Sequence, residues 1–173
     1  MTHPCLVVLT ARGPARLLAE RGTQAWRLNP AHVKSLEYCI CVQNRNNGHW
    51  GGADQEHHHA FMVGRISEVV LSPETPKRYL VVFSEYARID SPKAWPGLRN
   101  PVRYSNLEEF GIADPDALEW HPMPNALQAT SILTPGQDED QDGPGPLTMA
   151  EAKAGLALGL GVPESAIEII VKY

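Results

Sequence analysis

The chain has 173 residues, of which 43% are hydrophobic and 20% charged, and its formal net charge is -5 at pH 7. This composition is typical of a soluble globular protein, and no stretch approaches the roughly 20 apolar residues of a transmembrane helix. The N-terminus has no basic region followed by a long apolar core, so we expect no signal peptide and a cytoplasmic protein. Three cysteines in such a chain imply no disulfide framework.

The first part of the chain carries most of the secondary-structure patterns. Apolar or alternating runs predict strands, shorter helical patterns lie between them, and one segment is extended. The strands are expected at 4–11, 37–44, 59–71 and 78–89, the helices at 13–22, 30–36 and 105–111, and the extended segment at 23–30. Ser105 is the expected N-cap of the last helix. Cys39 and Cys41 are two apart in a strand, which indicates buried thiols on one face.

The segment 72–77, "SPETPK", has the length and composition of a hairpin turn, which makes its flanking strands antiparallel neighbours. Their apolar positions predict a core of Val63, Ile66, Val69, Val81 and Phe83. Several strands with short helices and no regular strand-helix alternation indicate the α+β class. We expect a small, curved, mostly antiparallel sheet or β-barrel with short flanking helices.

Three regions follow from the composition. Residues 1–134 hold thirteen basic and thirteen acidic side chains and form the expected α+β domain. Residues 135–146 combine Pro and Gly with four carboxylates and no apolar side chain, which indicates a solvated linker. In 147–173, Thr148 and Glu151 predict a helix from 149, and 165–173 predicts a strand. This C-terminal helix-strand appendage is too small to fold alone, so it docks, self-associates or binds a partner.

Three consecutive histidines precede an apolar strand pattern. In an extended chain His57 and His59 point to one side and His58 to the other. Two such imidazoles need a third ligand, such as His49, Glu56 or a cysteine, to form a zinc site. No specific zinc-ligand spacing is present, and a polar triplet before a strand is typical of an exposed loop. We therefore assign no metal and no cofactor, and keep zinc at His49, His57 and His59 as an alternative.

No catalytic motif stands out. The chain has no nucleophile elbow, no P-loop and no dinucleotide-binding glycine pattern after a strand. Neighbouring carboxylates such as Glu108 and Glu109 lie on a helix pattern whose polar face is expected to be solvated. We assign no catalytic residue, and a non-enzymatic role is favoured.

Two tryptophans lie where no local apolar pattern explains them. Trp50 is followed by two glycines, and Trp95 stands among prolines and glycine. Loop aromatics near arginine and asparagine suit the stacking of a planar ligand, at about 1–3 kcal/mol per stack; the alternative is that both rings cover the core. Trp26 and Trp120 are assigned to packing. The candidate ligand-binding residues are Trp50, Trp95, Asn44, Arg45, Arg99, Asn100, Arg103 and Tyr104.

The order "EYCICVQNRN", "HAFMVGRISEVV", "RYLVVFSEYARI" and "NPVRYSNLEEFGI" resembles the PUA-like barrels, especially the EVE and ASCH branches, over residues 36–112. The matching positions are Trp50, Gly64 and the pair Pro101–Val102. The resemblance implies a small β-barrel whose pocket reads nucleic acid, often a modified or flipped base. Residues 147–173 are similar to a short C-terminal module of uncharacterised bacterial proteins, which implies a bacterial source.

The function expected from the residues and this resemblance is that of a non-catalytic binding module. It would read a modified or flipped nucleobase, or a similar planar ligand, and its partner would be single-stranded or modified nucleic acid. One alternative is a metal-dependent hydrolase that uses the histidine cluster. Another is a protein-interaction module that acts through 147–173. No membrane partner is expected.

Overall fold

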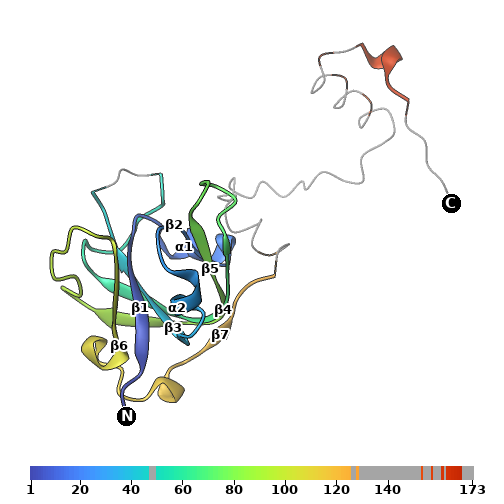
Figure 1. Cartoon of the computed structure of the whole chain (residues 1–173). Helices are drawn as coiled ribbons and strands as arrows, with labels where there is room; N and C mark the ends of the chain where they lie inside the picture. The colour runs from blue at the N-terminus through green and yellow to red at the C-terminus, as the bar shows by residue number, and fades with distance from the viewer. Residues whose placement is uncertain are drawn as a thin grey trace, which may run out of the picture. The chain divides into compact units, whose positions relative to one another are not determined.

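The computed structural model describes residues 1–46, 50–125, 128, 153, 157, 161 and 163–168. The chain divides into two compact units, Met1–Pro135 and Gly136–Tyr173. The first unit is a mixed α+β structure with one curved sheet and few helices (Figure 1). Its elements are β1 (Pro4–Thr10), α1 (Pro14–Glu20), β2 (Gly22–Trp26), α2 (Pro30–Val33), β3 (Tyr38–Gln43), β4 (Ala60–Leu71), β5 (Tyr79–Ser91), β6 (Val102–Asn106), the 3-10 helices η1 (Leu107–Phe110) and η2 (Pro115–Ala117), and β7 (His121–Pro122).

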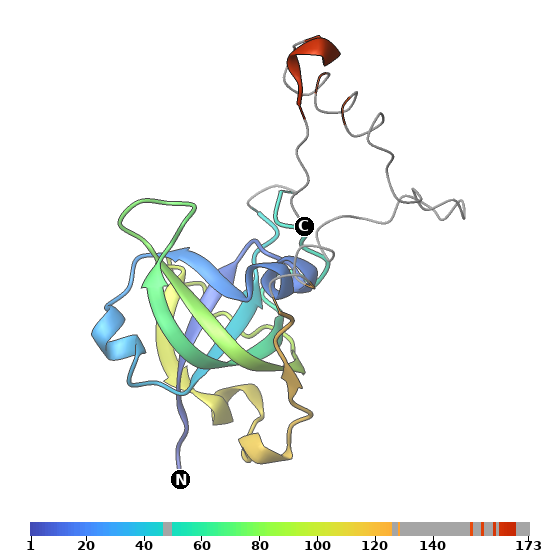
Figure 2. The same ribbon diagram turned by 90° about the vertical axis from the view of Figure 1, so that its right-hand side faces the viewer.

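The sheet has the strand order β2-β5-β4-β3-β1-β6, with β7 pairing with β5. Every pairing is antiparallel except that of β1 with β3, which is parallel. The sheet curls into a half-barrel, and Figure 2 shows the long strands β4 and β5 curving together along it. The curl leaves β2 and β6, the two edge strands of the order, unpaired with each other in the described part of the chain.

The sheet is buried on both faces in its middle. Along β1, Leu6 and Val8 belong to one core cluster, whereas Cys5 and Val7 belong to another. The same alternation along β3 places Cys39 and Cys41 on one face, as predicted, where both are free, fully buried thiols. Burial raises the pKa of Cys39 well above its ordinary value. Strands covered on both faces read as continuous apolar runs, which is why the sequence predicted them.

The hairpin of β4 and β5 was predicted in position and in pairing. Four of the five predicted core residues are buried, and the fifth, Ile66, packs against the core while partly exposed. The Phe83 ring lies against Gly64, although the register pairs Gly64 with Tyr86: a Cβ at Gly64 would overlap the Phe83 ring, well inside van der Waals contact. Gly64 therefore provides the space that the largest fully buried side chain of the fold occupies.

The helix predicted at 105–111 is present at Leu107–Phe110 as a 3-10 helix, but its predicted start and the N-cap at Ser105 were wrong. Residues 102–106 form β6, which pairs with β1, and η1 starts only at Leu107. Its N-cap position is Asn106, without a side-chain cap, and the Ser105 hydroxyl donates to Glu109 instead. Pairing with an already buried strand satisfies the backbone of this segment better than a short isolated helix does.

Little of the second unit is described. Lys153 and Ala157 have helical backbone, and Ala157 is buried. The strand predicted at 165–173 is wrong at its start, because Glu164–Ala166 form the 3-10 helix η3, and 169–173 lie outside the described residues. The predicted linker and the start of the predicted tail helix also lie outside them. No helix in the described part of the chain has both the length and the hydrophobicity needed to span a bilayer.

Candidate functional site

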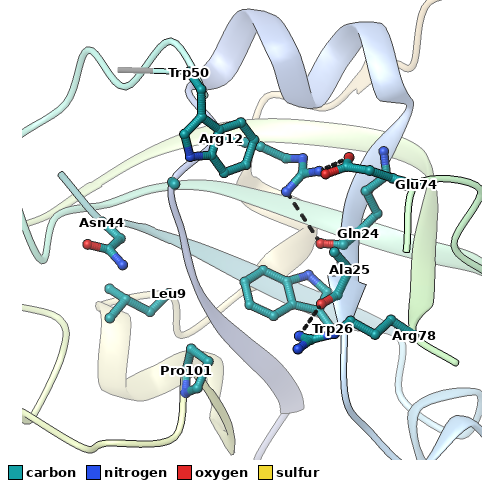
Figure 3. A pocket seen from close by; sticks show the side chains of 11 residues that line it. Leu9, Arg12, Gln24, Ala25, Trp26, Asn44, Trp50, Glu74, Arg78 and Pro101 are labelled. Carbon is teal, nitrogen blue, oxygen red and sulfur yellow. Dashed lines mark hydrogen bonds and ion pairs between the residues drawn. The ribbon is translucent and has the colours of Figure 1, made fainter. Parts of the chain in front are cut away.

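An open cavity of about 230 Å³ lies in the first unit (Figure 3). It is bordered by the end of β1 and the turn after it, by β2, by the loop after β3, by the β4–β5 hairpin, and by the residue before β6. The lining residues are Leu9, Ala11, Arg12, Gln24, Ala25, Trp26, Asn44, Trp50, Glu74, Arg78 and Pro101. Because β2 lies on one side and the segment leading into β6 on the other, the cavity occupies the seam that the unclosed sheet leaves.

Trp50 stands at this cavity with 48% of its surface exposed. Its position is set by backbone contact between its own loop and the turn after β1. Gly13 N–H donates to the Gly51 carbonyl at 2.8 Å. A Cβ at Gly51 would fall onto the Ala11 carbonyl, and a Cβ at Gly13 onto the Gly52 carbonyl. Gly13 and Gly51 therefore allow the backbone of the Trp50 loop to lie directly against the turn after β1. This contact fixes the backbone that carries the exposed indole.

Two arginines hold the Trp50 ring from the side of α1. The guanidinium carbons of Arg12 and Arg16 lie 5.0 and 5.2 Å from the ring centroid, within the range of cation-π attraction. Arg16 also donates from Nη1 to the Trp50 carbonyl at 3.0 Å, and from Nε to Glu20 at 2.8 Å. Ring and backbone of Trp50 are thus both anchored.

Arg12 is itself 3% exposed, and each of its three guanidinium nitrogens has a partner. Its Nε donates to Glu20 at 2.5 Å, its Nη2 to Glu74, and its Nη1 approaches the Gln24 carbonyl at 3.5 Å. A buried guanidinium needs such partners, because an unpaired charge in the interior is strongly destabilising. Arg12 therefore connects α1, β2 and the β4–β5 hairpin through these three contacts, and the carboxylates of Glu20 and Glu74 compensate its charge.

A second tryptophan, Trp26, lines the same cavity from β2. It is 8% exposed, and its Nε1 donates to the Thr23 hydroxyl at 2.8 Å, which fixes the indole. In Figure 3 the two indoles lie one above the other, with Leu9 and Asn44 to one side of them. The cavity thus offers two aromatic side chains and a small number of polar groups, the usual makeup of a site for a small organic ligand.

Of the eight predicted ligand-binding residues, the structure brings Asn44 and Trp50 to the cavity. Trp95 lies elsewhere: it is 5% exposed, belongs to the second core cluster, and donates from Nε1 to the Leu98 carbonyl. Arg103 pairs with Glu109 at 2.5 Å and lies over the Trp95 ring. These two residues are therefore part of the packing under β6.

The remaining predicted residues do not line the cavity. Arg45, Arg99 and Asn100 are exposed, and the Asn100 side chain accepts from the Val102 N–H at 3.4 Å. Tyr104 is 45% exposed and meets the edge of the His32 ring, with 4.6 Å between the centroids. Pro101, a position of the family resemblance, does line the cavity.

The histidines face different partners. His59 Nε2 lies 2.8 Å from Asp90, whereas His57 Nδ1 accepts from the Arg45 N–H at 3.1 Å and its ring lies against that of His58. Burial, and then His58, lower the pKa of His57. Among the residues that the structure describes, no three His, Cys, Asp or Glu side chains are grouped to hold a metal ion. His49, the third ligand of the zinc alternative, lies outside the described residues.

The cavity wall also includes Arg12, Gln24, Trp26, Glu74 and Arg78, none of which was a candidate ligand-binding residue. Arg12 lies between a predicted strand and a predicted helix, Gln24 and Trp26 in the segment predicted as extended, and Glu74 and Arg78 in the predicted turn and at the start of the strand after it. Nothing local distinguishes these residues. The sequence feature that could have indicated the cavity is the set of glycines at 13, 51 and 52. Gly13 and Gly51 allow two distant segments to come into backbone contact. Comparison of the chain with family models, curated proteins and solved structures found no significant match.

Proposed function

We propose that the first unit is a non-catalytic binding module whose cavity accepts a planar ring of nucleobase size. The observation that carries this proposal is the Trp50 indole, which is half exposed at a cavity yet held by its backbone and by two arginines. An exposed aromatic ring that gains little from burial, but is fixed in place, is what a stacking platform requires. Stacking on such a ring contributes about 1–3 kcal/mol per base.

The size and the resemblance support the same ligand class. The cavity volume of about 230 Å³ lies below the range of about 300–1,000 Å³ that is usual for drug-sized ligands. It suits one ring system, and because the cavity is open, groups attached to that ring can extend along its wall. The resemblance of residues 36–112 to PUA-like barrels suggests a modified or flipped base, and the curled sheet is consistent with it. A base must leave its stack to enter such a site, which favours single strands and weak pairs.

The test is binding of a short fluorescein-labelled single-stranded oligonucleotide of mixed sequence, as DNA and as RNA, followed by fluorescence anisotropy at low salt. Trp50→Ala should weaken binding by about 5- to 150-fold, which corresponds to about 1–3 kcal/mol. Tyr104→Ala is the matched control, because Tyr104 is an equally exposed aromatic residue that does not line the cavity. Absence of binding at low salt, or equal binding by Trp50→Ala and wild type, would overturn the proposal.

A further inference from the structure

The cavity is lined by two arginines, and they differ in what holds them. Arg12 is buried between Glu20 and Glu74, so its charge is taken up inside the fold. Arg78 donates from one nitrogen, Nη1, to the Ala25 carbonyl at 2.9 Å. Within the described part of the chain it forms no ion pair. Since a guanidinium has five N–H donors, most of those of Arg78 remain available to a ligand.

Arg78 is also held in place by its own hairpin. Its carbonyl accepts from the Ser72 N–H at 2.8 Å, and its N–H donates to the Thr75 carbonyl at 3.3 Å. The Ser72 hydroxyl donates to the Gln24 side chain at 3.0 Å, which ties the hairpin to β2. Together with the bond from Arg78 to Ala25, this fastens the end of the hairpin to the cavity wall. An arginine positioned in advance loses little freedom on binding.

The remaining polar group on the opposite wall is a donor as well. The Asn44 side-chain oxygen accepts from the Asn46 N–H at 2.9 Å, which leaves the Asn44 amide nitrogen to donate. The carboxylate of the lining, Glu74, accepts from Arg12 through Oε2, and this ion pair compensates its charge. The charged group of the lining that forms no ion pair within the described part of the chain is therefore the Arg78 guanidinium, and with the Asn44 amide it favours a ligand that brings acceptors. In Figure 3, Arg78 and Trp50 lie at opposite ends of the cavity wall. A ligand that contacts both residues therefore needs a planar ring for Trp50 and, at its other end, an anionic group for Arg78.

We infer that Arg78 forms an anion subsite of the cavity, and that the ligand is a nucleotide whose base stacks on Trp50 while a phosphate binds the Arg78 guanidinium. This inference rests on the proposed function and adds the phosphate to it. The planar fork of a guanidinium matches two phosphate oxygens at once, which a lysine ammonium does not. The same chemistry occurs in a free mononucleotide and in a nucleotide within a single strand.

The test uses the full-length chain and the labelled single strand, with affinity measured over a series of NaCl concentrations. Arg78→Gln should bind about 10-fold more weakly, and the slope of log K against log[NaCl] should become shallower by about 0.7, the value for one phosphate contact on a single strand. Arg78→Lys should keep the slope but bind more weakly than wild type, because it keeps the charge and loses the fork. Arg88→Gln, an exposed arginine outside the cavity, is the matched control and should change neither quantity.

Competition by unlabelled nucleosides and by the matching 5′-monophosphates identifies the source of the phosphate. Displacement by a monophosphate, but not by its nucleoside, supports a terminal phosphate, whereas displacement only by an unlabelled strand supports an internucleotide one. Wild-type affinity and slope for Arg78→Gln, together with weakened binding by Trp50→Ala, would refute the anion subsite and leave the proposed function standing. Wild-type binding by both variants would refute both. If Arg78→Gln fails to fold, as judged by circular dichroism, wild-type affinity of Arg78→Lys refutes the subsite instead.

Discussion

Replacing Gly51 by alanine tests whether backbone contact is what positions Trp50. The new Cβ would fall onto the Ala11 carbonyl, at a separation well under 3.0 Å. Because that atom belongs to the backbone directly after β1, no side-chain rotation relieves the overlap. The Trp50 loop has to move away from the turn that holds Gly13 and Arg12.

The magnitude follows from the contacts that this movement breaks. The hydrogen bond from Gly13 N–H to the Gly51 carbonyl is 2.8 Å long, and such a bond contributes about 0.5–1.5 kcal/mol. The contacts of Arg12 and Arg16 with the ring contribute about 0.5–1 kcal/mol each. Gly51→Ala should therefore lower the free energy of unfolding by about 1.5–3.5 kcal/mol. Trp50→Ala keeps the backbone bond and should lower it by only about 1–2 kcal/mol.

Urea denaturation followed by circular dichroism measures the stability change, and anisotropy with the labelled single strand measures binding. Gly51→Ala should bind as weakly as Trp50→Ala although it retains the indole. Asp54→Ala, an exposed position in the same loop, is the control and should alter neither measurement. A Gly51→Ala protein with the unfolding midpoint and the affinity of wild type would show that the glycine contact does not position Trp50.

Two further predictions concern the sheet and the histidine loop. Phe83→Ala should cost about 3–5 kcal/mol and Gly64→Ala about 1–3 kcal/mol. The double variant should cost less than the two together, because the added methyl group occupies space that the ring has left; additive costs in urea denaturation would contradict this packing. The pKa of His57 is lowered from 6.5, first by burial and then by His58. The unfolded chain therefore binds this proton at higher pH than the folded one, and stability should be lost as pH falls from 6.5 through the folded-state value. The Asn side chain in His57→Asn can still accept from the Arg45 N–H, so this variant should lose less stability than wild type between about pH 7.5 and about pH 5, a range that brackets the usual His pKa of about 6.5. An unchanged dependence of stability on pH would assign the titration to another group.

Local patterns in the sequence were enough to predict two kinds of element: strands that are buried on both faces, and a hairpin whose turn and flanking strands give the same indication. The apolar runs of β1 and β3 were recognised because both faces of these strands are buried, and the β4–β5 hairpin because its turn residues and alternating flanks agree. Local patterns failed for β6, where proline and polar residues conceal a strand that exists because β1 is available for pairing.

For the site, the sequence by itself named eight candidate residues, of which Trp50 and Asn44 line the cavity. Trp50 stood out because a tryptophan among glycines has no local packing partner. The local pattern does not distinguish a ring that meets a ligand from one that covers the core: Trp95 is buried in the core, whereas Trp26 both packs and lines the cavity. The physical reason is that exposure of a loop aromatic depends on which distant segments fold over it. The cavity itself joins segments from Leu9 to Pro101 across the seam of an unclosed sheet, so only the tertiary structure could assemble it.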